Sequence, residues 1–449
     1  MKQKLSFFEK LCFGGGNLAN CLILMMVSSY LMFYYTDIFK IDPIAVGTLF
    51  LIARFADAII DFSMGFIVDH THSRWGKFRP FIMFGCVPLL VFAILCFSAP
   101  DLSDNGKIIY AYITYLGVMV MYSVVSIPYT SMTSSLTLDP KERISVSTYP
   151  QFFGMFGNLI VTVITVPLVN HLGKGNDAKG YQYTMIAYCI VSLVLYILMV
   201  AKSKERVVIE NQEKFPLKKA LPVIFKNKPL MILVGFFVFA MASYTLRTST
   251  QMYYYTYSLG RKDLIAVIGL VTMIPLVGII PFIPKLTNIF GKKKLLIIGT
   301  GITALSSFVQ YFVPFDSLGA IYICSAVNGL GTGIFVTLIW GMLPDTVEYS
   351  EWKNGIRTEG VIYSSFTFAQ KVSMGLSGSL AGILLTTVGY SADKTLSPGT
   401  ISGISGIYNL ASGIGYIVAI IIVLFYDLSP EKYEIILDEL RKRGNNHAE

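Results

Sequence analysis

The chain has 449 residues, of which 54% are hydrophobic and only 14% are charged. A soluble domain carries about a quarter charged residues, so this composition excludes a soluble protein, which would need a more polar surface. We expect a lipid bilayer to solvate much of the chain. The meaning of the net charge of +9 then depends on where the basic residues lie.

A helix needs roughly 20 mostly apolar residues to cross a bilayer, and such segments recur along the whole chain. They lie at 12–35, 44–68, 80–99, 108–134, 150–169, 183–201, 230–256, 264–284, 295–313, 319–343, 361–388 and 403–426. The pattern predicts an all-α membrane protein with twelve transmembrane helices. The first apolar run is too long for a signal peptide and ends in no small-residue cleavage site, so we expect it to remain in the mature protein.

Basic residues are distributed unevenly between alternate loops. With the N-terminus placed in the cytoplasm, the cytoplasmic loops and termini hold 26 of the 36 Lys and Arg, and the outer loops hold seven. This bias is what the positive-inside rule predicts for a protein with both termini in the cytoplasm. It also accounts for the positive net charge without a nucleic-acid partner.

A polar, basic linker at 202–229 divides the chain into two halves of six predicted helices, at 1–201 and 230–426, with a cytoplasmic tail at 427–449. Each half has a short inner loop after its second helix, in which Gly76 or Gly291 stands beside basic residues. We therefore predict two pseudo-symmetric bundles that rock against each other around a midplane site.

The second predicted helix carries three charged residues, Arg54, Asp57 and Asp61. Their spacing of three and four residues places them on one helical face. Carboxylates are costly in a membrane, so they usually face a cavity and pair with another group. Two carboxylates one turn apart predict a site for Na⁺, Li⁺ or H⁺. The alternative is a structural salt bridge between Arg54 and one of the aspartates.

Three further residues within predicted helices have two interpretations each. Lys371 is too deep in the eleventh helix to reach the interface easily, so it either faces the cavity opposite the helix-two carboxylates or forms an interhelical bridge. Arg247 and the tyrosines after it either join the outer aromatic belt or contact substrate. Trp340 either stacks on a ring of the substrate or packs against helices and lipid.

The sequence lacks the usual signatures of an enzyme or a metal site. The six cysteines fall in apolar segments without a CxxC pair, and no histidine lies in a predicted helix, so we expect neither disulfides nor a metal cluster. The run Gly14–Gly16 has no downstream Lys-Ser or Lys-Thr, which argues against a phosphate-binding loop and ATP-driven transport. We expect no cofactor other than a coupling cation.

The stretch Ala53–Asp61, with Asp69 and Ser73–Pro80 after it, resembles the glycoside–pentoside–hexuronide:cation symporters of the major facilitator superfamily. Further matching blocks are Tyr34–Asp37, Ile127–Tyr129, Thr137–Arg143, and Asp345–Tyr349 continuing through Trp352, Arg357, Glu359 and Lys371. The resemblance spans nearly the whole chain. It implies the major facilitator fold and the uptake of a sugar together with H⁺ or Na⁺ across a bacterial inner membrane, by a protein that we expect to be monomeric.

The resemblance also implies roles for individual residues. Asp57 and Asp61 match cation-site carboxylates, where Na⁺ would bind, and Ser123 matches a hydroxyl ligand beside them. Arg54 matches a basic residue near that site, and Lys371 a lysine at the cation and sugar cavity. Cytoplasmic gating and structural elements are matched by Asp69, Arg74, Arg79, Asp345 and Arg357.

The sequence departs from the galactoside-transporting members of that family where they contact sugar. Asn20 and Cys21 replace a Lys–Asp pair, Ser126 replaces an aspartate, and Gln151 replaces an arginine. The substrate-binding candidates are therefore Asn17, Asn20, Cys21, Arg54, Ser126, Gln151, Arg247, Trp340 and Lys371.

A neutral glycoside or pentoside is the favoured substrate, because Arg247 lies toward the end of the seventh predicted helix, where backbone carbonyls could cap it or outer headgroups could be reached. The alternative is an acidic sugar such as a hexuronide, because the predicted helices hold three basic residues against two clear midplane carboxylates. A lysolipid carrier is less favoured, since the midplane is polar and the loops are short. Apart from the sugar, the only partner that we expect is membrane lipid.

Overall fold

The computed structural model describes residues 5–69, 71, 73–136, 140–203, 205, 225–354, 359–391 and 396–446. Within these ranges the regular structure is helical and no strand occurs, which confirms the all-α prediction. Eleven stretches of the described chain are long and apolar enough to cross a bilayer. The remaining expected segment, 361–388, is also helical (α13), and Ser, Thr, Gln and Lys residues interrupt its apolar sequence.

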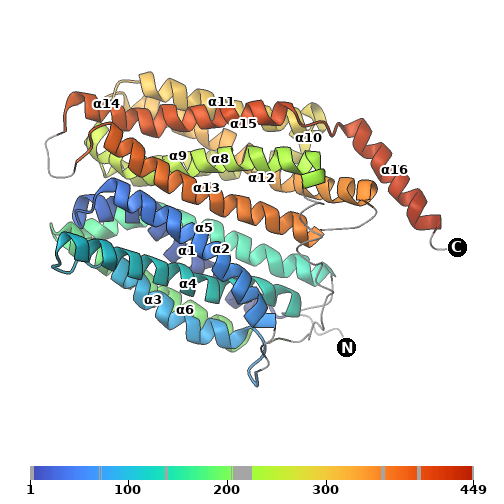
Figure 1. The fold of residues 1–449 in the computed structure, drawn as a ribbon, viewed down its shortest axis with the longest axis horizontal. Coiled ribbons are helices and arrows are strands. Elements are labelled where there is room, and N and C mark those ends of the chain that lie inside the picture. The colour runs from blue at the N-terminus through green and yellow to red at the C-terminus, as the bar shows by residue number, and fades with distance from the viewer. Residues whose placement is uncertain are drawn as a thin grey trace. The chain divides into compact units, whose positions relative to one another are not determined.

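The first half of the chain forms the six long helices that were expected there (Figure 1). They are α1 (Phe7–Phe33) with the π-helix η1 (Tyr34–Ile38), α2 (Pro43–Asp69), α3 (Arg79–Cys96), α4 (Asp104–Leu136), α5 (Pro140–Gly173) and α6 (Asp177–Lys202). A capping box starts α1, because Ser6 Oγ accepts from the Glu9 amide and the Glu9 carboxylate accepts from the Ser6 amide.

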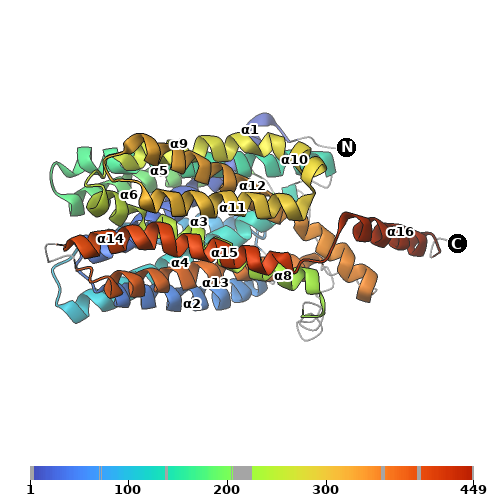
Figure 2. The same ribbon diagram turned by 90° about the horizontal axis from the view of Figure 1, so that it is seen from above.

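The second half contains the other expected helices, several of them interrupted. They are α8 (Lys228–Tyr253) with the π-helix η2 (Tyr254–Ser258), α9 (Leu264–Ile279), η3 (Ile280–Phe282), α10 (Ile283–Phe290), α11 (Lys292–Phe312), α12 (Leu318–Asn354), α13 (Glu359–Thr387), α14 (Pro398–Gly406), η4 (Ile407–Ala411), α15 (Ser412–Leu424) and α16 (Pro430–Asn446). The expected tail is thus helical over α16, which follows α15 after a short connection (Figure 2).

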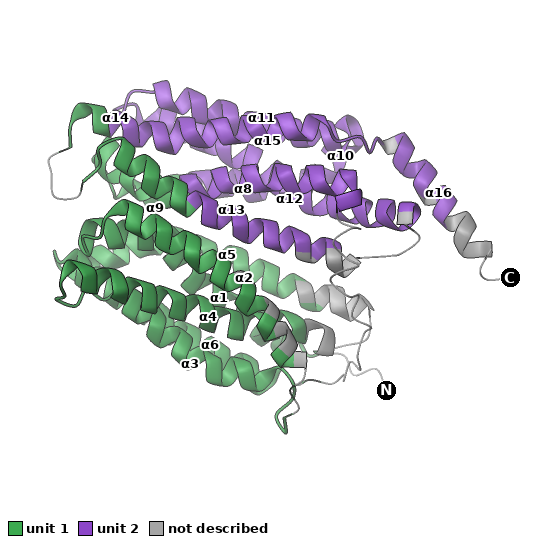
Figure 3. Cartoon of the chain, in the orientation of Figure 1, with its two compact units in different colours: residues 1–212, 248–269, 378–400 green, residues 213–247, 270–377, 401–449 purple. Residues whose placement is uncertain are grey.

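The chain divides into two compact units (Figure 3). Unit 1 comprises residues 1–212, 248–269 and 378–400, and unit 2 comprises 213–247, 270–377 and 401–449. Two segments from the second half of the sequence therefore belong to unit 1. The division into two six-helix bundles remains a prediction, because these compact units follow local contacts and not the sequence halves.

The π-helices η1 and η2 reveal an internal repeat. Both begin with Tyr-Tyr-Thr, at Tyr34 and at Tyr254, and both end in the same turn, because the residues after them, Lys40 and Gly260, have φ values of 63° and 64°. Equivalent backbone bonds close both turns, one from the Phe39 amide to the Tyr34 carbonyl at 2.9 Å and its counterpart at 3.0 Å. This repeat supports the expected pseudo-symmetry of the two halves.

The two predicted glycine turns also have matching geometry. Gly76 and Gly291 adopt φ values of 104° and 76°, a region that glycine enters at little cost. At the first turn the Glu205 carboxylate accepts from the amides of Lys77, Phe78 and Arg79 at 2.8–3.1 Å. This carboxylate therefore caps the positive end of α3 and holds the loop in place.

Candidate functional site

Asp57 lies at the centre of the predicted cation site, on α2 in unit 1. The residue is 3% exposed, and the hydroxyl of Ser123, on α4, donates to Oδ1 of its carboxylate at 2.9 Å. The structure therefore brings together two residues that the family resemblance had assigned to one site. Asp61 follows one turn further along α2 and is partly buried, so the two carboxylates remain on one helical face as expected.

Arg54 lies near Asp57 without closing a tight ion pair. Its Nη1 is 3.8 Å from Asp57 Oδ2, longer than the 2.7–2.9 Å typical of a charge-assisted hydrogen bond. The same Nη1 is 3.8 Å from Met119 Sδ, a weak acceptor. The expected salt bridge between Arg54 and an aspartate is thus present as a long ion pair, and the Asp57 carboxylate and the Ser123 hydroxyl supply oxygen ligands. Oxygen ligands of this kind suit hard cations.

Tyr122 extends this site on α4, beside Ser123. It lies within electrostatic range of Asp57, Asp61 and Arg54. No group of three or more His, Cys, Asp or Glu that could hold a metal ion occurs among the described residues. Separately, the two carboxylates and the hydroxyl offer oxygen atoms of the kind that bind a cation such as Na⁺, and a carboxylate can also carry a proton.

Asn17 and Asn20 on α1 offer complementary polar groups in unit 1. Asn17 donates through Nδ2 to the Pro150 carbonyl at 2.7 Å, and Asn20 accepts through Oδ1 from the Tyr196 hydroxyl at 2.6 Å. These bonds leave Oδ1 of Asn17 and Nδ2 of Asn20 to other partners. An acceptor and a donor without charge are what a neutral hydroxylated substrate requires.

The other candidates of unit 1 differ in exposure. Cys21 is partly buried, and a Cβ added at Gly157 of α5 would lie 2.9 Å from the Cys21 Cβ, so this side chain packs closely against α5. Ser126 is partly buried on α4, and Gln151 is exposed near the middle of α5. Cys21 lies within electrostatic range of Tyr122, as the charged residues of α2 do.

Arg247 is buried inside unit 2, with 8% of its surface exposed. Its Nη1 donates to Asn409 Oδ1 at 3.1 Å, to the Tyr408 carbonyl at 3.3 Å and to Ser307 Oγ at 3.4 Å, and its Nη2 donates to Gln310 Oε1 at 2.6 Å. The guanidinium also lies 4.0 Å from the ring centre of Tyr408. All of these partners are neutral, so they satisfy the donors without compensating the charge.

The aromatic-belt interpretation does not hold for Arg247, Tyr253 and Tyr254, whereas Tyr257 is partly exposed. Tyr253 and Tyr254 are fully buried, whereas a belt residue lies at the membrane surface. Their rings pack inside unit 1, and Arg247 is held by acceptors from α11 and η4 within unit 2. The sequence could not distinguish a tyrosine run at the membrane surface from one buried inside the protein, because both have the same residue pattern.

Trp340 and Lys371 lie in unit 2, on α12 and α13. Trp340 is 38% exposed and makes edge contacts with the rings of Phe237 and Phe366, so one side packs and another stays open. Lys371 is partly buried. Its expected position opposite the carboxylates of α2 remains a prediction, because those residues belong to unit 1.

The predicted gating residue Asp345 takes part in a network within unit 2. Lys292, which follows the turn at Gly291, donates to both carboxylate oxygens of Asp345 at 2.7–2.8 Å. Nearby, the Tyr433 hydroxyl of α16 bonds to the Glu348 carboxylate, and the Trp352 indole bonds to Glu439 at 2.6 Å. Burial raises the pKa of Tyr433, which keeps this hydroxyl protonated as a donor. These bonds fasten α16 to α12.

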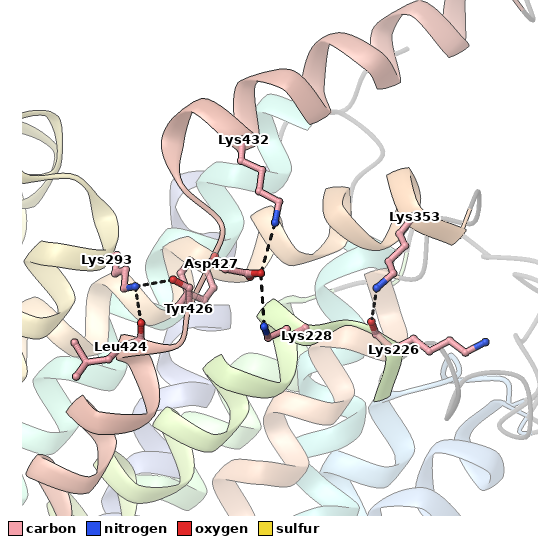
Figure 4. Close-up of polar contacts among 8 residues, drawn as sticks. All are labelled: Lys226, Lys228, Lys293, Lys353, Leu424, Tyr426, Asp427 and Lys432. Atoms are coloured by element: carbon pink, nitrogen blue, oxygen red, sulfur yellow. Dashed lines mark hydrogen bonds and ion pairs between the residues drawn. The ribbon is translucent and has the colours of Figure 1, made fainter.

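Further bonds at the same end of unit 2 involve lysines (Figure 4). Lys293 donates to the carbonyls of Leu424 and Tyr426 at 2.7 Å, at the end of α15. Asp427 lies between Lys228 and Lys432, at 3.9 and 3.5 Å. The first two lysines after Gly291 thus have separate partners. Lys292 pairs with Asp345, and Lys293 bonds the carbonyls at the end of α15.

The remaining gating candidates are described only in part. Arg79 donates through Nε to the Val200 carbonyl at 3.0 Å and through Nη2 to the same oxygen, which ties the start of α3 to the end of α6. Arg74 is exposed in the turn before it. Arg357 and the side chain of Asp69 lie outside the described residues.

A tyrosine cluster in unit 1 was not predicted from the sequence. It consists of Thr36, Asp37, Tyr253, Tyr257 and Tyr390. Thr36 Oγ1 is 2.6 Å from the Tyr253 hydroxyl, and the Tyr257 hydroxyl donates to Asp37. The Tyr390 ring contacts the rings of Tyr253 and Tyr257 at 5.3 and 5.7 Å. The cluster joins segments from both sequence halves, and its signal was the repeated Tyr-Tyr-Thr block.

Known proteins resemble the chain over its whole length. The sequence matches the family described as MFS/sugar transport protein over residues 12–430. It is 33% identical to the isoprimeverose transporter of Lactiplantibacillus pentosus, covering 100% of this chain and 94% of that protein. It is 30% identical to the glucuronide carrier protein homolog of Escherichia coli, covering 99% and 97%.

The structural comparison gives the same architecture. The fold is similar to the crystal structure of a D-xylose-proton symporter, with a TM-score of 0.65, 14% sequence identity and coverage of 94% of this chain and 97% of that one. At this identity the likeness concerns the fold alone, which is the major facilitator fold.

Proposed function

We propose that this chain, which belongs to the MFS/sugar transport protein family and is a sugar symporter and not an enzyme, imports a neutral glycoside or pentoside together with one cation. Coupling takes place by alternating access, with the cation bound by Asp57, Asp61 and Ser123. The cation is H⁺ or Na⁺.

The observation that carries this proposal is the contact between α2 and α4. A buried carboxylate bonded to a buried hydroxyl, with a second carboxylate one turn away, concentrates oxygen ligands where a membrane protein otherwise avoids them. Arg54 makes an ion pair of 3.8 Å with Asp57 and not a short hydrogen bond. A cation that these oxygens bind, and that is released to one side of the membrane, drives the conformational cycle.

The neutral substrate is supported by the polar groups that the structure offers. Asn17 and Asn20 present an uncharged acceptor and an uncharged donor. Arg247 is held inside unit 2 by one backbone carbonyl and three neutral side-chain acceptors, so its donors are satisfied without an anionic substrate. A relative named an isoprimeverose transporter fits the same class.

An acidic sugar is the second candidate. The specific observation in its favour is that the described hydrogen bonds of Arg247 leave its charge uncompensated. A glucuronide carrier homolog among the relatives belongs to that alternative. The proposal places the protein as a monomer in a bacterial inner membrane, with both termini in the cytoplasm.

Uptake by proteoliposomes tests the proposal. Labelled pentosides, neutral glycosides and hexuronides are offered in turn, with Na⁺ and pH gradients imposed separately. We expect accumulation of a neutral sugar under one of the two gradients and none without a gradient. Accumulation of hexuronides alone would replace the neutral substrate by the acidic one, and uptake that no cation gradient drives would contradict symport.

A further inference from the structure

A cavity of about 510 Å³ lies between α3 and α6, and neither Asp57 nor Ser123 lines it. Its volume falls within the range of about 300–1,000 Å³ that is typical of small-molecule sites. The residues that line it are Trp75, Arg79, Met83, Cys86, Val87, Leu193, Tyr196, Ile197, Val200 and Ala201. Apart from Trp75, Arg79 and the Tyr196 hydroxyl, the lining is mostly aliphatic.

The rim of the groove consists of side chains that face outward from the helices. Met83 and Val87 of α3 are 45% and 52% exposed, and Ile197 of α6 is 57% exposed. On a chain that spans a membrane, such aliphatic surface faces lipid and not water. The only hydroxyl in the lining, that of Tyr196, is used by Asn20. The groove therefore offers a sugar almost no hydrogen bonds.

The polar end of the groove is basic. Arg79 and Trp75 line it, and Arg74 and Lys77 belong to the same turn. The nearby acid Glu205 is occupied by three backbone amides of this turn. Trp75 is 52% exposed and stacks on the Phe84 ring at 5.6 Å, a position that suits the boundary between headgroups and acyl chains.

We propose that this groove binds one anionic phospholipid, with an acyl chain along α3 and α6 and the phosphate near Arg74, Lys77 and Arg79. Basic groups beside an apolar space between transmembrane helices are what recognises anionic headgroups. In the proposed orientation this lipid belongs to the cytoplasmic leaflet. The binding itself does not depend on which sugar or cation the protein carries.

In this proposal the bound lipid helps to hold the turn at Gly76, which precedes α3, in place. Arg79 already ties α3 to the Val200 carbonyl of α6, and both residues line the groove. An acyl chain between these two helices fills space that would otherwise be left unpacked. The headgroup binds the turn before α3 while the acyl chain packs along α3 and α6, so the lipid adds a second link beside the bond between Arg79 and Val200.

Fluorescence of Trp75 tests the proposal directly. The full-length chain with Trp340→Phe and Trp352→Phe keeps Trp75 as its single tryptophan. It is reconstituted in phosphatidylcholine containing increasing fractions of phosphatidylglycerol brominated in its acyl chains, which quenches nearby indoles. We expect half of the quenching at a mole fraction at least about tenfold lower than with brominated phosphatidylcholine, since each basic residue near the surface contributes on the order of 1 kcal/mol to binding an anionic lipid.

Paired variants locate the site. Val87→Phe narrows the groove, whereas Val91→Phe changes an equally exposed residue one turn along α3 that does not line it. We expect only Val87→Phe to weaken the preference. Arg74→Gln combined with Lys77→Gln should also abolish it, and Lys107→Gln, on α4, should not. Equal quenching by the two brominated lipids, or equal effects of Val87→Phe and Val91→Phe, would overturn the proposal.

Discussion

Ser123 and Asp57 show how a single hydroxyl marks the proposed cation site. The serine lies 66 positions from the aspartate in sequence, and its hydrogen bond of 2.9 Å turns Oδ1 of the carboxylate toward α4. Helical spacing alone predicted that Asp57 and Asp61 share a face. It did not predict which residue of another helix faces them, and that assignment came from the family resemblance.

Ser123→Ala should weaken binding of the coupling cation. The variant loses a ligand oxygen and leaves Asp57 with one partner fewer, and a hydrogen bond to a charged group contributes about 1.5–3 kcal/mol. We expect the cation concentration for half-maximal uptake to rise about tenfold or more. Thr130→Ala is the control, because Thr130 on the same helix bonds only to carbonyls of its own helix. Equal shifts in both variants would remove Ser123 from the site.

Arg247→Gln separates the two substrate classes. If the arginine is structural, the variant should lower the melting temperature of the purified protein, because it strands acceptors on α11 and η4. The apparent affinity for a neutral sugar should stay unchanged. A loss of affinity by about tenfold or more for the best substrate would show that Arg247 binds the acidic group of an anionic sugar.

At the scale of elements, the π-helices η1 and η2 carry the most informative repeat. Apolar runs predicted nearly every long helix, because span length follows from bilayer thickness. They did not predict the tyrosine cluster, since the bond between Asp37 and Tyr257 joins residues 220 positions apart. In the proposed orientation the cluster lies at the outer end of unit 1 and joins segments from both halves of the sequence.

Tyr257→Phe should loosen this outer contact. The ring is retained but the hydrogen bond to Asp37 is lost, at a net cost on the order of 1–3 kcal/mol. We expect a cysteine introduced at Ser258 to react several-fold faster with a membrane-impermeant thiol reagent added outside. Tyr183→Phe, which alters an exposed tyrosine of α6, serves as the control. Unchanged labelling in Tyr257→Phe would show that the hydroxyl does not hold the contact.

The glycine turns make a prediction about stability. Gly76 has a φ of 104°, and a Cβ added there would overlap the Glu205 carboxylate. Gly76→Ala should therefore lower the melting temperature, at a cost of at least about 1 kcal/mol. Gly341→Ala meets no atom within 4 Å in α12 and should leave stability unchanged or raise it. Similar melting temperatures for the two variants would contradict the strained turn.

At the scale of the molecule, composition and loop charges were sufficient to predict a polytopic helical membrane protein. Motif resemblance extended this to the family, which the match over residues 12–430 confirms. The surroundings of Arg247 were beyond reach, because its acceptors come from residues 60 and more than 160 positions away. Long-range packing of this kind leaves no local pattern in the sequence.

Gradient-driven accumulation by Asp57→Asn and Asp61→Asn tests the central claim most directly. Both substitutions keep the shape of the side chain and remove its charge, while Asp42→Asn does the same at the exposed start of α2, where Asp42 accepts from the Ile44 amide at 2.8 Å. In proteoliposomes with an imposed cation gradient, we predict that each of the first two variants loses concentrative uptake and keeps exchange of substrate without a gradient, and that Asp42→Asn accumulates substrate like the unmodified protein. Full accumulation by both Asp57→Asn and Asp61→Asn would contradict the cation site.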